Sequence, residues 1–292
     1  METSELLQLV IAGLKNGSIY ALLALGFTIV YAATNVINFA QGEFYMLGGM
    51  FAVFAFSRFG LPLVVAVPVA VLVVAGIGVL FERLAIRPRK DAEPMALIII
   101  TVGGSLVFAS LARHAFGSDA LPLPEFTPGP SIPFAGAAIE RQALWIWGIV
   151  LVTVAGLTFL YSKTRLGRAM RACMQNREAA RLMGIDTARV VMISFGLAAA
   201  LGALAGVAVT PLTSTRFDIG AGIAVKGFAA AILGGLGNPL AAVAGGLLLG
   251  LIEQAVIPFS SALKDVVALA VLLAVLFLRP QGLFTRSRRE KV

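Results

Sequence analysis

Repeated apolar segments, each close to the length that crosses a lipid bilayer, are the feature that most constrains this chain. A helix needs about 20 residues to span the hydrocarbon core. Of the 292 residues, 59% are hydrophobic and only 13% are charged, whereas an ordinary soluble domain carries about 25% charged residues. The sequence therefore predicts an all-α, polytopic membrane protein with a single transmembrane domain over residues 1–292. The candidate spans are 17–34, 36–57, 61–81, 95–113, 142–161, 189–209, 221–236, 240–257 and 263–279, which suggests about eight to nine membrane helices, some of them broken or re-entrant.

The distribution of positive charge predicts which loops face the cytoplasm. Sixteen of the 23 Lys and Arg residues fall in the connections 82–94 and 162–189 and in the tail 279–292, and basic residues mark cytoplasmic loops. The loop 114–141 is acidic and rich in proline, so we expect it in the periplasm. This topology also explains the net charge of +8 without a nucleic-acid partner. The N-terminus lies outside if 36–57 crosses fully, and inside if that segment is re-entrant.

The late segment 221–257 carries the densest group of helix-breaking residues. A cytoplasmic C-terminus is expected to require an odd number of membrane crossings after the loop 162–189. Four candidate spans follow this loop, so we expect that one of them stops short or that two of them form one re-entrant element. The breakers single out this segment. They are Gly234, Gly235, Gly237, Asn238, Pro239, Gly245 and Gly246.

A second, polar break interrupts the early apolar stretch 16–50. Its residues are Asn35, Asn38, Gln41, Gly42 and Glu43. Exposed polar groups are costly in lipid, so such a break persists where it lines a cavity or packs against protein. Paired interruptions in the two halves of a transporter point to its transport site. We therefore interpret 34–43 and 234–239 as lining a translocation path. Helix capping is the alternative, because Asn38 and Gln41 have capping-box spacing and a helix N-terminus favours the carboxylate of Glu43.

The central loop 162–189 is too long and too patterned to be a simple connector. Gly184 suits a helix C-cap, and Asp186 can cap the next helix. The run Glu178-Ala179-Ala180-Arg181-Leu182-Met183-Gly184 resembles the EAA-x-x-x-G loop of bacterial ABC importer permeases, the helix that docks in a groove of the ATPase subunit. The Ile-x-Leu-Pro ending of the longer motif is absent. The resemblance implies that ATPase coupling involves Glu178, Ala179, Ala180, Gly184, Arg177 and Arg181.

Three stretches extend the resemblance over nearly the whole chain. They are residues 13–49, 176–207 and 226–254, and they are similar to the branched-chain amino acid ABC transporter permease family, specifically the shorter permease of its heterodimeric pair. The resemblance implies an ABC importer permease architecture in the bacterial inner membrane. It also implies a second permease subunit, two ATP-binding subunits that hold ATP and Mg, and a periplasmic solute-binding protein. Leucine, isoleucine and valine are the implied solutes, although relatives also carry urea, short amides or aromatic acids.

Few side chains are available for chemistry. The chain has one cysteine, Cys173, and one histidine, His114, so we expect no metal site, no cofactor in this chain and no enzyme activity. Lys226 and Glu253 lie on either side of the late break 234–239 and can either pair or snorkel to the interface. The alternative function is a secondary carrier or passive channel for a small solute such as urea or an amide. Such a protein would also have broken helices, but it would not need the basic central loop.

Overall fold

The computed structural model describes residues 3–89, 92–260, 263–279 and 282–284, and this part of the chain is almost entirely helical. The expected all-α fold is confirmed. The helices are α1 (Thr3–Thr34), α2 (Gln41–Phe59), α3 (Leu63–Phe81), α4 (Pro94–Phe116), α5 (Arg141–Lys163), α6 (Arg165–Gln175), α7 (Arg177–Leu182), α8 (Thr187–Thr213), α9 (Ile219–Gly234), α10 (Pro239–Val256) and α11 (Leu263–Leu278), with a π-helical turn η1 (Glu82–Ile86) and a 3₁₀ turn η2 (Arg87–Arg89) after α3. An antiparallel pair, β1 (Ile132–Phe134) and β2 (Ala137–Ile139), forms a hairpin in the loop 114–141. Lys90 and the basic tail residues Arg286, Arg288, Arg289 and Lys291 lie outside the described residues.

Six helices are long and apolar enough to cross a membrane, which confirms a multi-pass membrane protein. They are α1, α3 with the turns that follow it, α4, α5, α8 and α10. In α1, 89% of the most apolar window is buried inside the protein, whereas the value for α4 is 17%. α3, α4 and α5 are apolar but exposed, so they lie at the periphery of the bundle. α1 is the central helix of the bundle.

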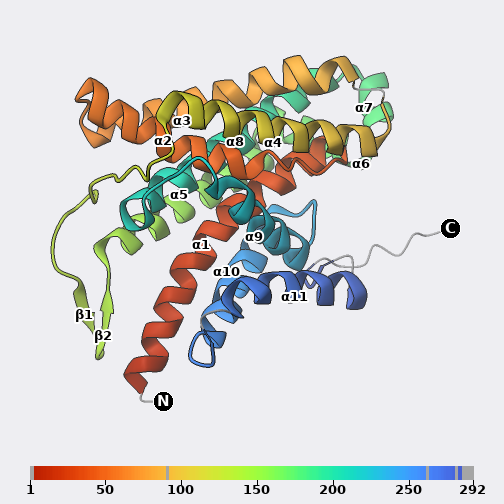
Figure 1. Cartoon of the computed structure of the whole chain (residues 1–292). Coiled ribbons are helices and arrows are strands. Elements are labelled where there is room, and N and C mark those ends of the chain that lie inside the picture. The colour runs from red at the N-terminus through yellow and green to blue at the C-terminus, as the bar shows by residue number, and fades with distance from the viewer. Residues whose placement is uncertain (1–2, 90–91, 261–262, 280–281, 285–292) are drawn as a thin grey trace.

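The two ends of the bundle are distinct, and they show which loop lies beside the start of α1. The β1–β2 hairpin lies beside the start of α1, and α6 and α7 lie at the opposite end (Figure 1). Gln8 exchanges two hydrogen bonds with the backbone of Ala138, at 2.8 and 3.2 Å. Lys15 forms an ion pair with Glu140 at 2.7 Å. α1 therefore starts on the same side as the loop 114–141, the predicted periplasmic side.

The late segment forms two helices, α9 and α10, and the count of crossings behind the expected re-entrant element was wrong. A chain that leaves the cytoplasmic side and returns to it crosses an even number of times, so four spans satisfy the topology. α9 begins near Thr215, whose backbone pairs with Leu121 of the outer loop at 2.8 Å, and it ends at a turn beside α6. α10 then returns to the N-terminal end of α1. α9 and α11 each have 16 residues, or roughly 24 Å of helix.

Glycines let the buried helices approach one another closely. A Cβ atom on Gly17 or Gly250 would meet backbone atoms of the facing helix, so α1 and α10 touch along their backbones. The same is true of Gly48 and Gly206, which join α2 to α8. Small residues at such crossings are typical of membrane helices, where close packing drives association.

We predict that Gly206→Val destabilises the bundle, whereas Gly148→Val is tolerated. A side chain at Gly206 would meet the carbonyl of Tyr45, but Gly148 in α5 has open space around it. Overpacking a buried site costs about 1–3 kcal/mol or more. Thermal unfolding of the two variants in detergent, followed by size-exclusion chromatography, measures the difference. Equal melting temperatures would contradict the assigned α2–α8 contact.

Candidate functional site

The early polar break is a six-residue turn between α1 and α2. Asn35 has a positive φ of 55°, a conformation that asparagine tolerates better than most residues. The Thr34 hydroxyl donates to the carbonyl of Val30 at 2.8 Å and accepts from the backbone N–H of Val36 at 3.1 Å. Asn38 Oδ1 accepts from the backbone N–H of Ala40 at 3.1 Å. These side chains replace the helical hydrogen bonds that the break removes.

Gln41 fixes the start of α2 against two other helices. The side chain is fully buried, and Nε2 donates to the carbonyl of Ala198 in α8 at 2.8 Å. The amide also lies against Gly26 of α1 and Gly202 of α8, where a Cβ would collide with it. The capping box suggested by the Asn38–Gln41 spacing is therefore not formed. α2 begins alongside the middle of α1 and α8, so the turn carries the chain back into the bundle.

Glu43 marks the point where α2, α4 and α9 meet. It is 2% exposed and lies in the first turn of α2, the position at which the helix dipole favours a carboxylate. Ser105 of α4 donates to Oε1 at 2.9 Å, and the carboxylate lies against the Cα of Gly220 at the start of α9. Gly42 packs against the carbonyl of the same glycine. Within the described part of the chain, Glu43 Oε2 has no hydrogen-bond partner.

The late break is a tight turn between α9 and α10. Gly235 and Gly237 have φ values of 117° and 95°. Asn238 caps α10, because its Oδ1 accepts from the backbone N–H groups of Leu240 and Ala241 at 3.2 and 3.3 Å. Gly234 packs against the backbone of Ala241, so α9 and α10 are in close contact at the turn.

The two breaks line different cavities. Thr34, Val36 and Asn38 border a small cavity with Arg177. Gly237 and Asn238 border an open cavity of about 380 Å³ with Tyr161 and Arg171. The predicted pairing of the two segments in one path is therefore not visible as a shared cavity. The early break, not the late one, contains the buried polar side chains.

Lys226 and Glu253 pair inside the bundle. Lys226 Nζ lies 2.7 Å from Glu253 Oε1, and the Tyr20 hydroxyl donates to Glu253 Oε2 at 2.5 Å. Glu253 is fully buried. Lys226 also borders an open cavity of about 560 Å³ together with Tyr45 and Thr213. Sequence reasoning did not single out Tyr20 or Ser105, because an isolated Tyr or Ser in an apolar span carries no pattern.

The central loop forms two short helices, α6 and α7, with well-defined ends. Asn176 caps α7 by accepting from the backbone N–H of Ala179 at 2.9 Å. Gly184 has a φ of 81°, and the N–H groups of Gly184 and Ile185 donate to the carbonyls of Arg181 and Ala180 at 3.0 and 3.1 Å. This pair of hydrogen bonds forms a Schellman motif.

One side of α7 is anchored and the other is exposed. Ala180 packs with Met170 and Cys173 of α6 in a buried cluster, and burial raises the pKa of the Cys173 thiol, with Arg177 offsetting part of the effect. Leu182 and Met183 are 89% and 83% exposed. Glu178, Ala179 and Arg181 are also exposed. The structure thus places the predicted coupling residues together on a short, rigid helix at the predicted cytoplasmic end.

The polytopic bundle, with a broken early helix and a capped helix pair at one end, has the architecture expected for a membrane permease. Its fold is shared with an ABC transporter of the metal-chelate type solved in an inward-facing conformation, with a TM-score of 0.53 and 15% identity over 94% of this chain and 87% of that one.

The chain belongs to the family described as branched-chain amino acid transport system / permease component, whose model matches residues 9–276. It is 33% identical to the high-affinity branched-chain amino acid transport system permease protein BraD of Pseudomonas aeruginosa, over 100% of this chain and 99% of that one. It is 35% identical to the corresponding LivH protein of Escherichia coli K12, over 98% and 97%. The resemblance found in the sequence is confirmed.

We predict that Gly184→Ala loosens α7 and that Gly184→Asn restores most of its order. A residue with a Cβ costs about 1–2 kcal/mol in the left-handed region, whereas Asn tolerates it better. Hydrogen exchange over residues 177–185 should accelerate by roughly ten-fold in Gly184→Ala, as expected for about 1.4 kcal/mol. Gly156→Ala in α5, where a Cβ meets open space, serves as the control. Unchanged exchange in Gly184→Ala would contradict the assigned cap.

Proposed function

We propose that this chain is the membrane-spanning permease of an ATP-driven importer for branched-chain amino acids in the inner membrane. Its partners are a second permease, two ATP-binding subunits that hold ATP and Mg, and a periplasmic solute-binding protein. The family match and the names of BraD and LivH support the substrate class. The chain contributes the path and its switch, and ATP hydrolysis takes place in the separate subunits.

The observation that carries this proposal is the form of α7. Its buried side is held by α6, and its tip presents Leu182 and Met183 to the solvent beside Arg181. Exposed apolar residues rimmed by polar ones mark a protein contact. A passive channel or a secondary carrier has no need for such a rigid cytoplasmic projection. We assign Glu178, Ala179, Ala180, Gly184, Arg177 and Arg181 to ATPase coupling.

The translocation path, in this proposal, follows the early break. Asn38, Gln41, Gly42 and Glu43 supply polar groups where α2, α4 and α9 meet, and Asn35 lies exposed at the cytoplasmic end of the turn. Gly234, Gly235, Gly237 and Asn238 contribute a sharp turn at the cytoplasmic end of α9, where the two helices can shift against each other. A zwitterionic solute needs few charges along such a path, because the binding protein supplies most of the affinity.

We predict that reconstituted vesicles accumulate leucine only when the partner permease, the ATPase subunits, the binding protein and ATP are all present. Uptake of radiolabelled leucine, with urea as the comparison solute, measures both coupling and substrate class. Leucine or urea flux through the permeases alone would instead support the carrier or channel. ATP-dependent uptake of a different solute would change the substrate class and leave the transporter class intact.

We also predict that Leu182→Cys, made together with Cys173→Ala, is labelled by a maleimide in the isolated permease and protected in the full assembly. The side chain is exposed on α7, and the docked ATPase would cover it. Ser131→Cys in the same background, exposed in the outer loop, is the matched control and stays reactive when the ATPase subunits alone are added. Equal labelling of Leu182→Cys with and without these subunits would contradict docking at α7.

A further inference from the structure

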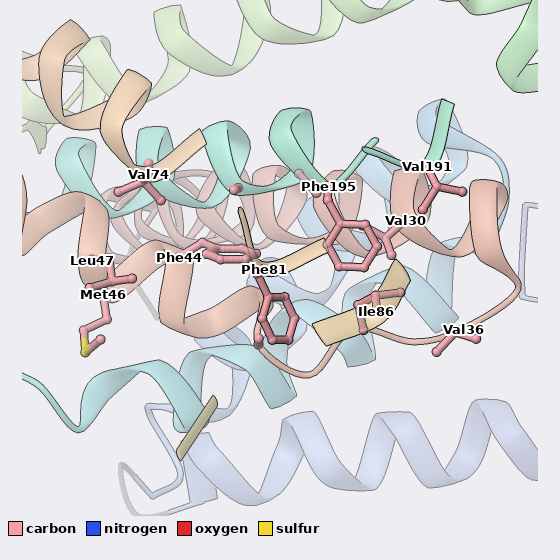
Figure 2. Packing of buried hydrophobic residues seen from close by; sticks show 14 of the residues in the cluster. Val30, Val36, Phe44, Met46, Leu47, Val74, Phe81, Ile86, Val191 and Phe195 are labelled. Carbon is pink, nitrogen blue, oxygen red and sulfur yellow. The ribbon is translucent and has the colours of Figure 1, made fainter. Parts of the chain in front are cut away.

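A small, partly open cavity with a mostly apolar lining lies between the helix break and the coupling helices. Its volume is about 30 Å³. The apolar wall of the cavity lies at one end of a large cluster of buried hydrophobic residues. The wall residues are Val30, Val36, Ile86, Val191 and Phe195 (Figure 2). Its polar lining comprises Thr34, Asn38, Glu82, Arg87, Thr101 and Arg177. The cavity thus brings together residues of the break, of the end of α3, and of α7.

Two buried polar groups face this space without partners. Glu82 is 2% exposed and Asn38 is fully buried. Within the described residues, Glu82 Oε2 and Asn38 Nδ2 form no hydrogen bond with the protein. A buried water needs roughly 10–15 Å³, so the cavity has room for about two. Water in this space would join the amide donor of the break to the carboxylate acceptor of α3.

Glu82 reaches the cavity because the helix changes its winding there. α3 passes into the π-helical turn η1, which begins at Glu82. Single π-helical turns recur at functional sites. Glu82 was not predicted from the sequence, because it directly follows an apolar span. It also lies in the basic connection 82–94, which we interpreted only as a marker of membrane topology.

Arg177 lies between the cavity and the cytoplasm. It lines this cavity and also an open notch of about 390 Å³ that Glu178, Arg181 and Asp186 border. The Glu82 carboxylate is within electrostatic reach of Arg87, Arg83 and Arg177. Among the described residues, none of these arginines forms an ion pair with it within 4 Å. The charges therefore face each other across a space that a small movement of α7 would close or widen.

We propose that Glu82 is a positioning residue for energy coupling, which senses the position of α7 through Arg177 and passes it to the helix break through Asn38. The inference rests on the proposed function, since it assumes that an ATPase moves α7. When α7 moves inward, Arg177 attracts the Glu82 carboxylate and draws it away from the hydrated amide of Asn38. When α7 moves outward, the carboxylate returns, and the turn at 35–40 is held again. The Glu82 carboxylate thus interacts alternately with Asn38 of the break and with Arg177 of α7.

A purely structural role for Glu82 makes the opposite prediction for stability. An unpaired buried carboxylate is costly, so Glu82→Gln, which keeps the shape and removes the charge, should leave the melting temperature equal or higher. A residue needed for packing or folding would lower the melting temperature instead. The measurement is thermal unfolding of the assembled transporter.

The decisive experiment measures leucine uptake and ATP hydrolysis in vesicles that contain the complete assembly. We expect Glu82→Gln to lower the leucine carried per ATP hydrolysed by about ten-fold, within the 5- to 150-fold range of coupling between sites. Arg177→Gln should have a similar effect, and the double variant should be no worse than either single one. Glu82→Arg with Arg177→Glu should regain part of the coupling.

Arg89→Gln is the matched control, because Arg89 is exposed on the same connection and does not line the cavity. Leucine uptake per ATP within two-fold of wild type in Glu82→Gln would overturn the proposal. Multiplying losses in the double variant, or an equal loss in Arg89→Gln, would also overturn it. Failure of the proposed function itself would show differently, as wild-type uptake that does not depend on the ATPase subunits.

Discussion

Backbone polar groups inside a membrane protein must find partners within the protein, and the break between α1 and α2 depends on this constraint. Thr34 and Asn38 bond to the local backbone, and Gln41 bonds to Ala198 of α8. Because the break is satisfied in this way, α2 starts inside the bundle, where Glu43 can meet α4 and α9. The geometry of the candidate path is therefore a result of how the turn 35–40 and the two helix ends beside it are hydrogen-bonded.

The two candidate functional regions differ in how completely their polar groups are hydrogen-bonded. α7 is capped at both ends by Asn176 and Gly184, and Ala180 packs it against α6. The break, in contrast, is bordered by a cavity in which polar groups are incompletely paired. A movement of α7 is therefore expected to change the conformation of the incompletely hydrogen-bonded turn before that of the capped helix.

Local features could be predicted from the sequence, and long-range ones could not. The caps at Gly184 and Asp186 follow from residues a few positions apart, and both are confirmed. The family resemblance gave the class of protein. The junction of Glu43 with Ser105 and Gly220 joins residues 62 or more positions apart, and nothing in the spacing of a serine or a glycine reveals it. The capping box is not formed, because the side chain of Gln41 donates to the carbonyl of Ala198 in α8 instead. The parity argument for a re-entrant segment was wrong, because a chain that leaves one side of the membrane and returns to it crosses an even number of times.

The central position of α1 has a consequence for how the protein is made. α1 is the first helix of the described chain to be synthesised, and its closest packing partner, α10, is nearly the last. Tyr20 of α1 contributes to the polar cluster with Glu253 of α10. During translation the ribosome must therefore add more than two hundred residues after α1 before α10 is complete. Until then, α1 is surrounded by lipid or by the insertion machinery and not by its native partner. Assembly of the bundle is thus a late, post-insertion event, set by the order of the helices along the chain.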